Sequence, residues 1–514
     1  MDTCIKCLST NIRKRGTYLN NTTKENKQRY SCNACNSSWS VVITNEHTSF
    51  DLKSEQIDAT YNFSNKNKYV ITSCQNDTLI NNEFYATLKS YCEIHDAELL
   101  ILRTKYKASD ADAEHYLVDN AHLLTHNIVI KDSVKVFGAL NLMPTLVSPL
   151  SGLESLSKGH TCIFGHNSIQ MNTLPVNDGD HPIMMHTTGT ISLPNNSDTK
   201  TGQKADYNHS FSALILEVDE DAFYIRTVTA DDNGGFYDLN HYYHLEDIIA
   251  NTRIEGIVLG DVHVDVVSQE VVQATFENED SIVNTLKPKV IVYHDLLDFN
   301  QIQSHHNKNN YLKRYLKYIK GENDIEAELK RTVDFIKYVD NDFVEENLIV
   351  SSNHIDHLEK FLNLADIKSD YKNSIIYYYL MYKMLIAIRD GKDTSAFQLY
   401  FEEYCDDKDV LKKTTFLGRE DTYFIKDILV SSHGDMGLGG SRFSPSQGKK
   451  FPHKMIVGHS HQPSVNQNLY IAGTCTGKLD YAKGVPSGWM NSHVVIYPDG
   501  SRTHINIIKG KWRL

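Results

Sequence analysis

The 514-residue sequence contains no apolar run approaching the roughly 18 to 20 residues that a helix needs to cross a bilayer. Its first ten residues, MDTCIKCLST, also lack the apolar segment of a secretory signal. These two absences argue against a membrane protein and against a secreted one. We therefore expect a cytoplasmic protein with no membrane partner.

The sequence has no surplus of positive charge, because its formal net charge is −13. The average field of such a protein repels a polyanion, so nucleic-acid binding would need bound cations or a local basic patch. Hydrophobic residues make up 40% of the chain and charged residues 23%, which is typical of a globular protein. The length is enough for two to four domains. No internal repeat is evident.

The chain has nine cysteines, and this odd number does not favour a framework of paired disulfides. Four of them form two C-x-x-C pairs near the N-terminus: Cys4, Cys7, Cys32 and Cys35. Four thiolates in two tight turns can hold one tetrahedral zinc, and a unit this small needs the metal to fold. We predict a zinc ribbon over residues 1–45, with one structural zinc. Up to Val41 it has seven Lys or Arg and two acids, a net +5 that suits nucleic acid, although many zinc ribbons dock only proteins.

A polar linker is expected over residues 46–67, followed by an additional α/β region over 68–250. In that region YVITS (69–73) and AELLILRT (97–104) have the composition of buried strands, and the segment 81–96 between them has helical spacing. Strands that alternate with helices predict parallel pairing. The segment 211–230 predicts a β-hairpin.

No chemistry stands out in residues 68–250, and we assign the region no role. Its histidines His166, His181, His186 and His209 are scattered, which favours surface or core positions. The phrases GHNSIQ and GTIS are interpreted as isolated turns.

From residue 251 the pattern changes to short apolar strands that each end in a polar cluster. The five strands are GIVLG, KVIVYHD, ENLIVSSNH, DILVSSHGD and KMIVGHSH. Helical segments are expected between them at 310–321, 324–340 and 371–391, and the aromatic stripe of the last one is expected in a core or an interface.

The ends of these five strands carry carboxylate, amide and imidazole side chains. They are Asp261, His263, Asp295, Asn353, His354, His433, His459 and His461. Side chains at the carboxyl ends of parallel strands converge on one place. Mixed oxygen and imidazole donors suit manganese, iron or zinc better than calcium, and an aspartate can bridge two such ions. The sequence therefore predicts a site for two divalent ions, manganese being the first choice.

These motifs resemble the calcineurin-like metallophosphoesterases, whose pattern runs D-x-H, G-D-x-x-D, G-N-H-D/E, H, G-H-x-H. The resemblance covers residues 251–514 and implies a catalytic β-sandwich flanked by helices. It implies the following ligand sets: Asp261, His263 and His461 for one ion, Asn353, His433 and His459 for the other, and Asp295 as the bridge. His354 would be the unligated catalytic residue that protonates the leaving oxygen. In this sequence Ile355 replaces the acid that normally orients that histidine, and Asp356 follows it.

Phrases such as SNHIDHL and SHGDMGLGGSR resemble a phage-encoded branch of the family. That branch implies a metal-dependent deoxyribonuclease that degrades host DNA in the host cytoplasm, with DNA as substrate and homo-oligomerisation left open. His305, His306 and Arg442 are candidate phosphate contacts. Two alternatives remain: a phosphomonoesterase acting on phosphoprotein or nucleotide, and a zinc-ribbon adaptor with a degenerate phosphoesterase core.

Overall fold

The computed structural model describes residues 3–19, 26–42, 66–106, 116–299, 311–441, 443–448, 450–479 and 482–514. The chain divides into two compact units, Met1–Asp58 and Ala59–Leu514. Positions 46–65 of the predicted linker lie outside the described residues. None of the helices in the described ranges is both long enough and apolar enough to cross a membrane.

The first unit contains one antiparallel sheet of three strands, β1 (Ile12–Leu19), β2 (Asn26–Cys32) and β3 (Ser38–Val42). Tyr30 lies opposite Trp39, and the two rings stack with centroids 5.7 Å apart. Cross-strand aromatic pairs of this kind stabilise small sheets. Tyr30 thus lies in a strand of the compact N-terminal unit.

The second unit has a six-stranded sheet in the order β20-β19-β18-β17-β26-β27. The strands are β17 (Gly256–Val258), β18 (Val290–Tyr293), β19 (Glu346–Val350), β20 (Thr414–Leu417), β26 (Asn491–Ile496) and β27 (Arg502–Ile507). The first four in the order are parallel, while β26 and β27 are antiparallel to their neighbours. Apolar runs without alternation build these strands because both faces of the sheet are covered.

A ten-stranded sheet has the order β21-β22-β23-β25-β24-β10-β11-β9-β8-β7. Its C-terminal half comprises β21 (Phe424–Ile425), β22 (Ile428–Leu429), β23 (Lys454–Val457), β24 (Ser464–Asn466) and β25 (Leu469–Ile471). Its other half comprises β7 (Asn127–Ile130), β8 (Val134–Phe137), β9 (Thr161–Phe164), β10 (Gln170–Leu174) and β11 (Ile183–Thr187). The regions 68–250 and 251–514 thus share one sheet.

A five-stranded sheet, in the order β13-β12-β4-β5-β6, completes the main framework. Its strands are β4 (Lys68–Gln75), β5 (Glu98–Thr104), β6 (Leu123–Leu124), β12 (Ser212–Val218) and β13 (Phe223–Thr229). The predicted parallel pairing of β4 with β5 and the predicted hairpin β12–β13 are confirmed. A small antiparallel sheet of β14 (Phe236–Asp238), β15 (His241–His244) and β16 (Asp247–Ala250) follows.

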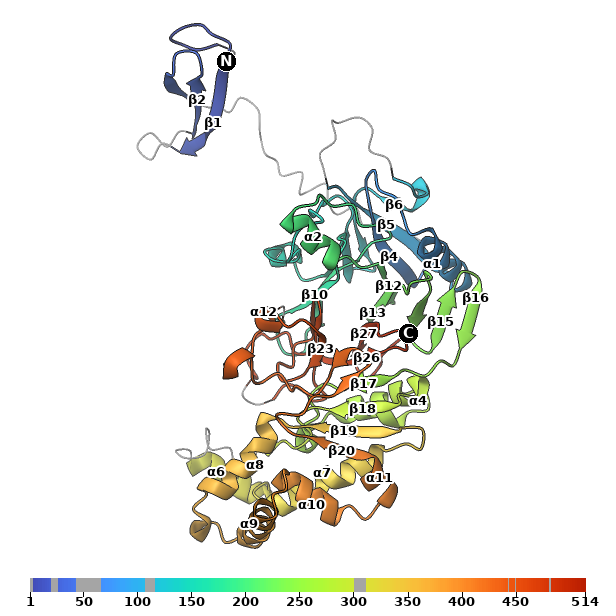
Figure 1. Ribbon diagram of the computed structural model, residues 1–514, viewed down its shortest axis with the longest axis vertical. Helices are drawn as coiled ribbons and strands as arrows, with labels where there is room; N and C mark the ends of the chain where they lie inside the picture. Colours follow the sequence, from blue (N-terminus) through green and yellow to red (C-terminus); the bar gives the residue numbers. More distant parts are fainter. Residues whose placement is uncertain are drawn as a thin grey trace. The chain divides into compact units, whose positions relative to one another are not determined.

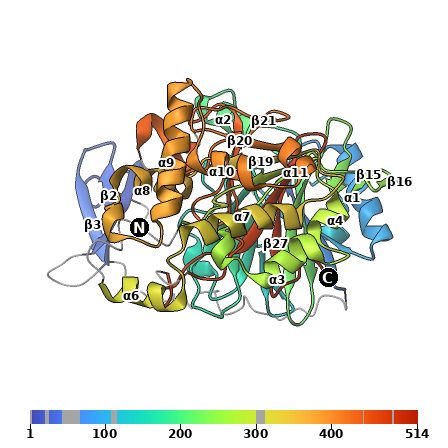
Figure 2. The ribbon, with the colours of Figure 1, turned by 90° about the horizontal axis from the view of Figure 1, so that it is seen from below.

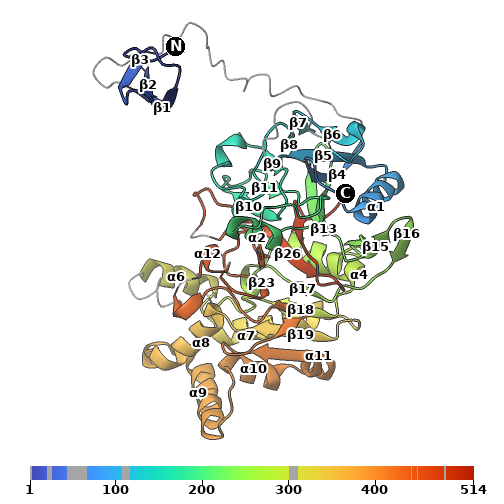
Figure 3. The ribbon, with the colours of Figure 1, turned by 45° about the horizontal axis from the view of Figure 1, so that its top comes forward.

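The three large sheets form two sandwiches. Val258 and Val292 of the six-stranded sheet pack against Ile456 and Tyr470 of the ten-stranded sheet in one buried cluster. Residues of the five-stranded sheet, such as Leu100, pack against the other half of the ten-stranded sheet in a second cluster. The ten-stranded sheet is therefore shared, with one partner sheet over each half (Figure 3).

Helices cover the outer faces of the two partner sheets. Figures 1 and 2 show α7 (Ile325–Val339), α8 (Asn353–Leu364) and α10 (Ala396–Tyr404) gathered beside β19 and β20. The helix α1 (Asn82–Ile94) packs its apolar face on β4 and β5. The apolar residues of these helices recur at amphipathic spacing, so each helix buries its apolar face against the sheet and exposes the opposite face.

The predicted helical segments appear as α6 (Tyr311–Lys320), α7 and α9 (Ser374–Arg389). On α9 one face is buried through Ile376 and Leu380, as a core position requires. Other apolar side chains of the same helix, including Tyr382, are exposed.

Candidate metal centre

The carboxyl ends of the parallel strands meet at one edge of the six-stranded sheet, and the predicted site residues follow them directly. Asp261 and His263 come after β17, Asp295 after β18, and Asn353 and His354 after β19. Three histidines reach the same place from the facing sheet: His433 after β22, and His459 and His461 after β23. The structure thus brings together seven of the eight side chains that the strand-end argument selected, and the eighth, Asn353, directly precedes His354 in the chain.

Three groups of possible ligand atoms form at this edge: the two described next share Asp295, and the third contains His263, Asp298 and His354. Asp261, His263, Asp295 and His461 are all buried and offer one ligand atom each within 4.8 Å of one another. A second group with the same spacing contains Asp295, His433 and His459. Asp295 belongs to both groups, which is the position that a carboxylate bridging two ions occupies.

Individual distances within the cluster are short. His461 Nε2 lies 3.0 Å from Asp261 Oδ2, and His433 Nε2 lies 3.0 Å from Asp295 Oδ2. His263 Nε2 is 3.3 Å from His461 Nε2 and 3.7 Å from Asp295 Oδ2. Imidazole nitrogens that face one another and the same carboxylates can coordinate cations at these positions.

The backbone at the cluster is held in the left-handed region. The φ angles are 46° at His263, 43° at Asp295, 71° at His459 and 58° at His461. Residues other than glycine rarely adopt this conformation, and it persists where the surrounding structure fixes it at functional sites. Its presence at four of the gathered residues indicates that their side chains are aimed at one point.

The glycine of GHSH is required by the same packing. A Cβ on Gly458 would lie 2.2 Å from Asp261 Oδ1 and 3.1 Å from the Cβ of His294. The backbone N–H of His459 also donates to Asp261 Oδ1 at 3.1 Å. The turn after β23 therefore passes so close to Asp261 that no side chain fits there.

Asn353 enters the site from the first turn of α8. Ser352 caps this helix, because its hydroxyl accepts from the N–H of Ile355 at 3.4 Å. Asn353 Oδ1 and Asp295 Oδ1 are buried without a hydrogen-bond partner. Unpartnered buried oxygens beside imidazoles are what a cation site contains before the ion is added, so the donor set fits two divalent ions.

Charge complementarity among these groups shifts their pKa values. Burial raises the pKa of Asp261, but the hydrogen bond with His461 and the charge of His433 outweigh it and lower the pKa to about 2. Burial lowers the pKa of His263, while the hydrogen bond with Asp298 and the charge of Asp295 raise it to about 9. The carboxylates are therefore ionised at neutral pH, as metal ligands must be.

Asp298 is a site residue that the sequence argument did not select. Its Oδ1 lies 2.9 Å from His263 Nδ1 and 3.6 Å from His354 Nδ1, and its backbone oxygen hydrogen-bonds to the same nitrogen of His354. The signal was present, because Asp298 is the second acid of the D-x-x-D spacing in HDLLD. Asp356, the expected substitute, instead pairs with Arg419 at 2.7 Å.

His354 lies at the edge of the cluster and keeps 16% of its side-chain surface exposed. Its ring centroid is 4.7 Å from that of His263. It is more accessible than His263, His433 and His461, whose side chains are 4% exposed or less. It can therefore meet a substrate oxygen without being enclosed among the predicted ligands.

The proposed phosphate contacts His305, His306 and Arg442 lie outside the described residues. In the N-terminal unit, Cys4, Cys7, Cys32 and Cys35 place their sulfur atoms within 4.8 Å of one another. The Sγ–Sγ distances Cys4–Cys35 and Cys7–Cys32 are both 3.6 Å. Tetrahedral zinc with Zn–S bonds of about 2.3 Å requires about 3.8 Å, so this cluster fits the predicted zinc.

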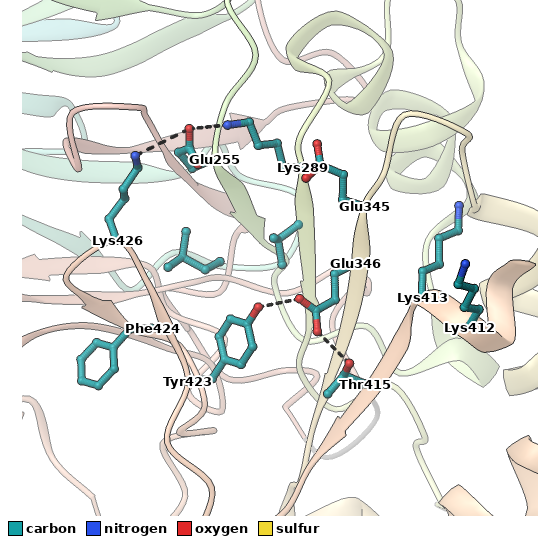
Figure 4. Close-up of a pocket in the computed structure, with 12 residues that line it drawn as sticks. Glu255, Lys289, Glu345, Glu346, Lys412, Lys413, Thr415, Tyr423, Phe424 and Lys426 are labelled. Atoms are coloured by element: carbon teal, nitrogen blue, oxygen red, sulfur yellow. Dashed lines mark hydrogen bonds and ion pairs between the residues drawn. The ribbon is translucent and has the colours of Figure 1, made fainter.

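A cavity of about 430 Å³ lies at the opposite ends of the parallel strands (Figure 4). Its charged groups are already paired, since Glu346 accepts from Tyr423 and Thr415, and Glu255 pairs with Lys289 at 2.8 Å. Ligands of parallel α/β sheets gather at the carboxyl ends of the strands. This cavity therefore does not compete with the cluster at Asp295.

A comparison with known proteins identifies the family of the chain. It is 31% identical over 473 residues to Protein A1 of Escherichia phage T5, an alignment that covers 87% of this chain and 82% of that protein. The chain belongs to the family of phage T5 Protein A1. No protein-family model matches the chain. No solved structure matches it either. The A1 relationship spans both sandwiches and does not itself assign a reaction.

Proposed function

We propose that this member of the A1 family is a metal-dependent deoxyribonuclease that hydrolyses phosphodiester bonds at a two-metal centre. The proposal includes a metallophosphoesterase sandwich for residues 251–514 and manganese as the first-choice ion, with iron or zinc as the other candidates. The phage relationship supports a role during infection, and we extend it to degradation of host DNA in the host cytoplasm.

The observation that carries the proposal is the sharing of Asp295 between two groups of buried ligands. A single metal site needs no such shared carboxylate, whereas two ions about 3.5 to 4 Å apart do. Two ions at that spacing are characteristic of enzymes that cleave phosphate esters.

Asp261, His263 and His461 would hold one ion, and Asn353, His433 and His459 the other, with Asp295 between them. When bound, two divalent ions supply a nucleophile at neutral pH and neutralise phosphate charge. Asp298 fixes the ring of His263 through Nδ1, leaving Nε2 to face the ions.

His354 is the catalytic proton donor in this proposal. Because Asp298 engages its Nδ1, the free Nε2 can hold the proton that passes to the leaving oxygen. The basic N-terminal ribbon, with its net +5, would offset the repulsion between DNA and a chain of net charge −13. Its zinc cluster is a structural element of that arm.

The deciding experiment incubates the full chain with linear, circular and single-stranded DNA in Mn²⁺, beside p-nitrophenyl phosphate. We expect DNA cleavage that EDTA abolishes and little release of p-nitrophenol. Strong monoester hydrolysis without DNA cleavage would favour the phosphomonoesterase. Absence of both activities, with elemental analysis finding only the ribbon zinc, would favour the adaptor with a degenerate core.

A further inference from the structure

The ten-stranded sheet has a symmetric strand order about its centre. There β10 pairs with β24 antiparallel, with Gln170 opposite Asn466, Met171 opposite Val465 and Asn172 opposite Ser464. Outward from this pair, each half continues with a strand antiparallel to the first (β11 or β25), then a parallel one (β9 or β23), then another parallel one (β8 or β22). Each half ends in an antiparallel strand, β7 or β21.

The pairing registers make the two halves equivalent residue by residue. In the first half, β9 pairs with β11 through Cys162–Met185, Ile163–His186 and Phe164–Thr187. In the second half, β23 pairs with β25 through Met455–Leu469, Ile456–Tyr470 and Val457–Ile471. Both registers place a G-H dipeptide directly after the first strand of the pair and a G-T dipeptide two residues after the second. The phrases GHNSIQ and GTIS, interpreted above as isolated turns, therefore occupy the positions of GHSHQP and GTCT.

Matching hydrogen bonds extend the equivalence to the partner sheets. Thr190 Oγ1 donates to the backbone oxygen of Ser73 at 2.9 Å, and Thr474 Oγ1 donates to that of Asp261 at 3.1 Å. The residues that follow these two threonines make a second matching pair of hydrogen bonds. The N–H groups of Ile191 and Cys475 donate to the same two backbone oxygens, at 3.0 and 2.8 Å. The five-stranded order β13-β12-β4-β5-β6 also follows the six-stranded order β27-β26-β17-β18-β19.

The two edge strands β13 and β27 meet as well. The N–H of Thr227 donates to Thr503 Oγ1 at 2.9 Å. The two sandwiches thus face each other as the subunits of a two-fold dimer do, with equivalent strands β10 and β24 in contact and equivalent strands β13 and β27 in contact.

The first copy has lost the ligands of the second. Ser73 stands where Asp261 stands, Gln75 takes the place of His263, and Ser168 that of His461. The pairing registers place Leu102 of β5 where Asp295 stands, because Leu99 pairs with Val70 as Val292 pairs with Val258. The one histidine that the first copy keeps, His166, accepts from the N–H of Ser168 at 3.0 Å and hydrogen-bonds to the backbone oxygen of Met143 at 3.1 Å.

Several polar groups at the strand ends of this copy hydrogen-bond to one another. Asn167 Nδ2 donates to Gln75 Oε1 at 3.0 Å, and Gln75 Nε2 donates to Thr78 Oγ1 at 3.1 Å. Within the described part of the chain, each group of three or more clustered metal-ligating side chains belongs either to the N-terminal ribbon or to the second copy.

The silent copy nevertheless reaches the metal centre through the loop between β10 and β11. Val176 and Ser487 exchange both backbone hydrogen bonds at 3.0 Å. Asp178 pairs with Lys478 at 2.5 Å and accepts from the N–H of Gly484 at 3.1 Å. The equivalent connection between β24 and β25 is only Gln467 and Asn468, so this extension belongs to the silent copy alone.

The segment held in this way borders a ligand. The Trp489 ring lies 4.3 Å from that of His461, and the N–H of Met490 donates to the backbone oxygen of His461 at 3.2 Å. Gly488 permits the approach, since a Cβ there would lie 2.6 Å from Thr173 Oγ1 of the silent copy. An unbroken set of contacts therefore runs from Asp178 to His461.

We propose that the 68–229 sandwich is a metal-free duplicate of the catalytic one, serving as a built-in partner whose β10–β11 loop braces the Trp489 segment against the metal centre. Asp178 is the positioning residue. The catalytic consequence rests on the proposed function, whereas the brace itself does not.

The test measures backbone hydrogen exchange of residues 482–490 in the full chain carrying Asp178→Ala. We expect exchange roughly tenfold faster, because a charge-assisted contact and the bond to the Gly484 N–H are lost. Asp178→Glu should restore slow exchange. Asp180→Ala, in the same loop, is the matched control, since its described hydrogen bond is with Asn177 and not with this segment. Lys478→Met removes the ion pair from the other side, together with the bond from Lys478 to the backbone oxygen of Val485, and covers a failure of Asp178→Ala to fold.

Mn²⁺ binding by calorimetry supplies the second measurement. Weakening the support of His461 should lower Mn²⁺ affinity roughly tenfold in Asp178→Ala, and Asp180→Ala should leave it unchanged. Exchange rates equal in Asp178→Ala and Asp180→Ala would overturn the brace, whereas two Mn²⁺ ions retained in Asp295→Asn would refute the bridging role of Asp295 in the proposed function. Faster exchange in a chain that cleaves no DNA would keep the brace and refute the proposed function.

Discussion

The two sandwiches share a strand order but differ in what they place at their strand ends. The 251–514 copy ends its strands in buried carboxylates and imidazoles with unpartnered oxygens. The 68–229 copy ends them in Ser73, Gln75 and Ser168, whose neighbours satisfy one another. The same strand order thus carries a candidate reaction centre in one copy and a hydrogen-bonded polar cluster in the other. Function therefore resides in the side chains that a fold presents and not in the fold itself.

Backbone conformation follows the same division. In the 251–514 copy, His263, His459 and His461 have positive φ values. Their counterparts in the other copy do not appear among the described positive-φ residues. Strain of this kind is maintained where it aims a side chain, so its absence from the silent copy is consistent with the loss of a ligand to aim.

The largest effect expected from a single substitution is at the shared carboxylate. Asp295→Asn removes the charge that both groups of ligands use, so Mn²⁺ binding at both positions and DNA cleavage should fall to background. Cleavage of labelled DNA and elemental analysis measure this. The matched pair His461→Ala and Ser168→Ala sharpens the comparison, because the first should lose activity on the order of a hundredfold or more while the second should retain it. Equal losses in that pair would contradict a silent copy.

A stability effect should dominate when the silent copy is damaged. Arg226 is buried and bonds Asp238 at 2.7 Å and Glu217 at 3.0 Å. Arg226→Met leaves Asp238 with the hydroxyl of Tyr91 and Glu217 with Lys68 but removes the cation that both acids share, so it should reduce the free energy of unfolding by about 3 to 5 kcal/mol. Urea unfolding followed by circular dichroism measures the change. In the folded variant the number of bound Mn²⁺ ions should not change, and a selective loss of Mn²⁺ would instead make Arg226 part of the metal support.

His354→Asn tests the division of roles inside the catalytic copy. Its imidazole is expected to donate a proton and not to hold an ion, so both Mn²⁺ ions should remain bound while turnover falls roughly a hundredfold. Calorimetry and single-turnover cleavage separate the two effects. Full activity in the variant would remove His354 from the mechanism, and loss of one ion would make it a ligand.

The sequence predicts those parts of the fold and of the site that depend on residues close together in the chain. Strand ends such as GDVH and GHSH are local, so the gathering of Asp261 and His461 followed from the rule for parallel sheets. Asp298 was missed because its role depends on the rotation of two imidazoles that only the fold brings together. The duplication was missed because it survives in short phrases, GHNS and GTIS, whose meaning lies in strand register and not in residue identity.

The smallest effect concerns a carboxyl beneath the metal centre. Glu328 on α7 is buried, and burial together with the charges of Asp265 and Asp298 raises its pKa well above the usual 4.5. The folded chain therefore holds a proton there that the unfolded chain releases near pH 4.5. The resulting stability is complete below that pH and is lost as pH rises towards the folded pKa.

Glu328→Gln keeps the neutral form at every pH, so its melting temperature should exceed that of the unmodified chain by an amount that grows from pH 5 to pH 8. A gain on the order of 1 kcal/mol at pH 7 is expected. Calorimetric scans at several pH values measure it, with Glu326→Gln on the exposed side of the same helix as control. A difference that does not vary with pH would mean that Glu328 is ionised in the folded chain, and the metal centre would then have a further negative charge beneath it that the silent copy lacks.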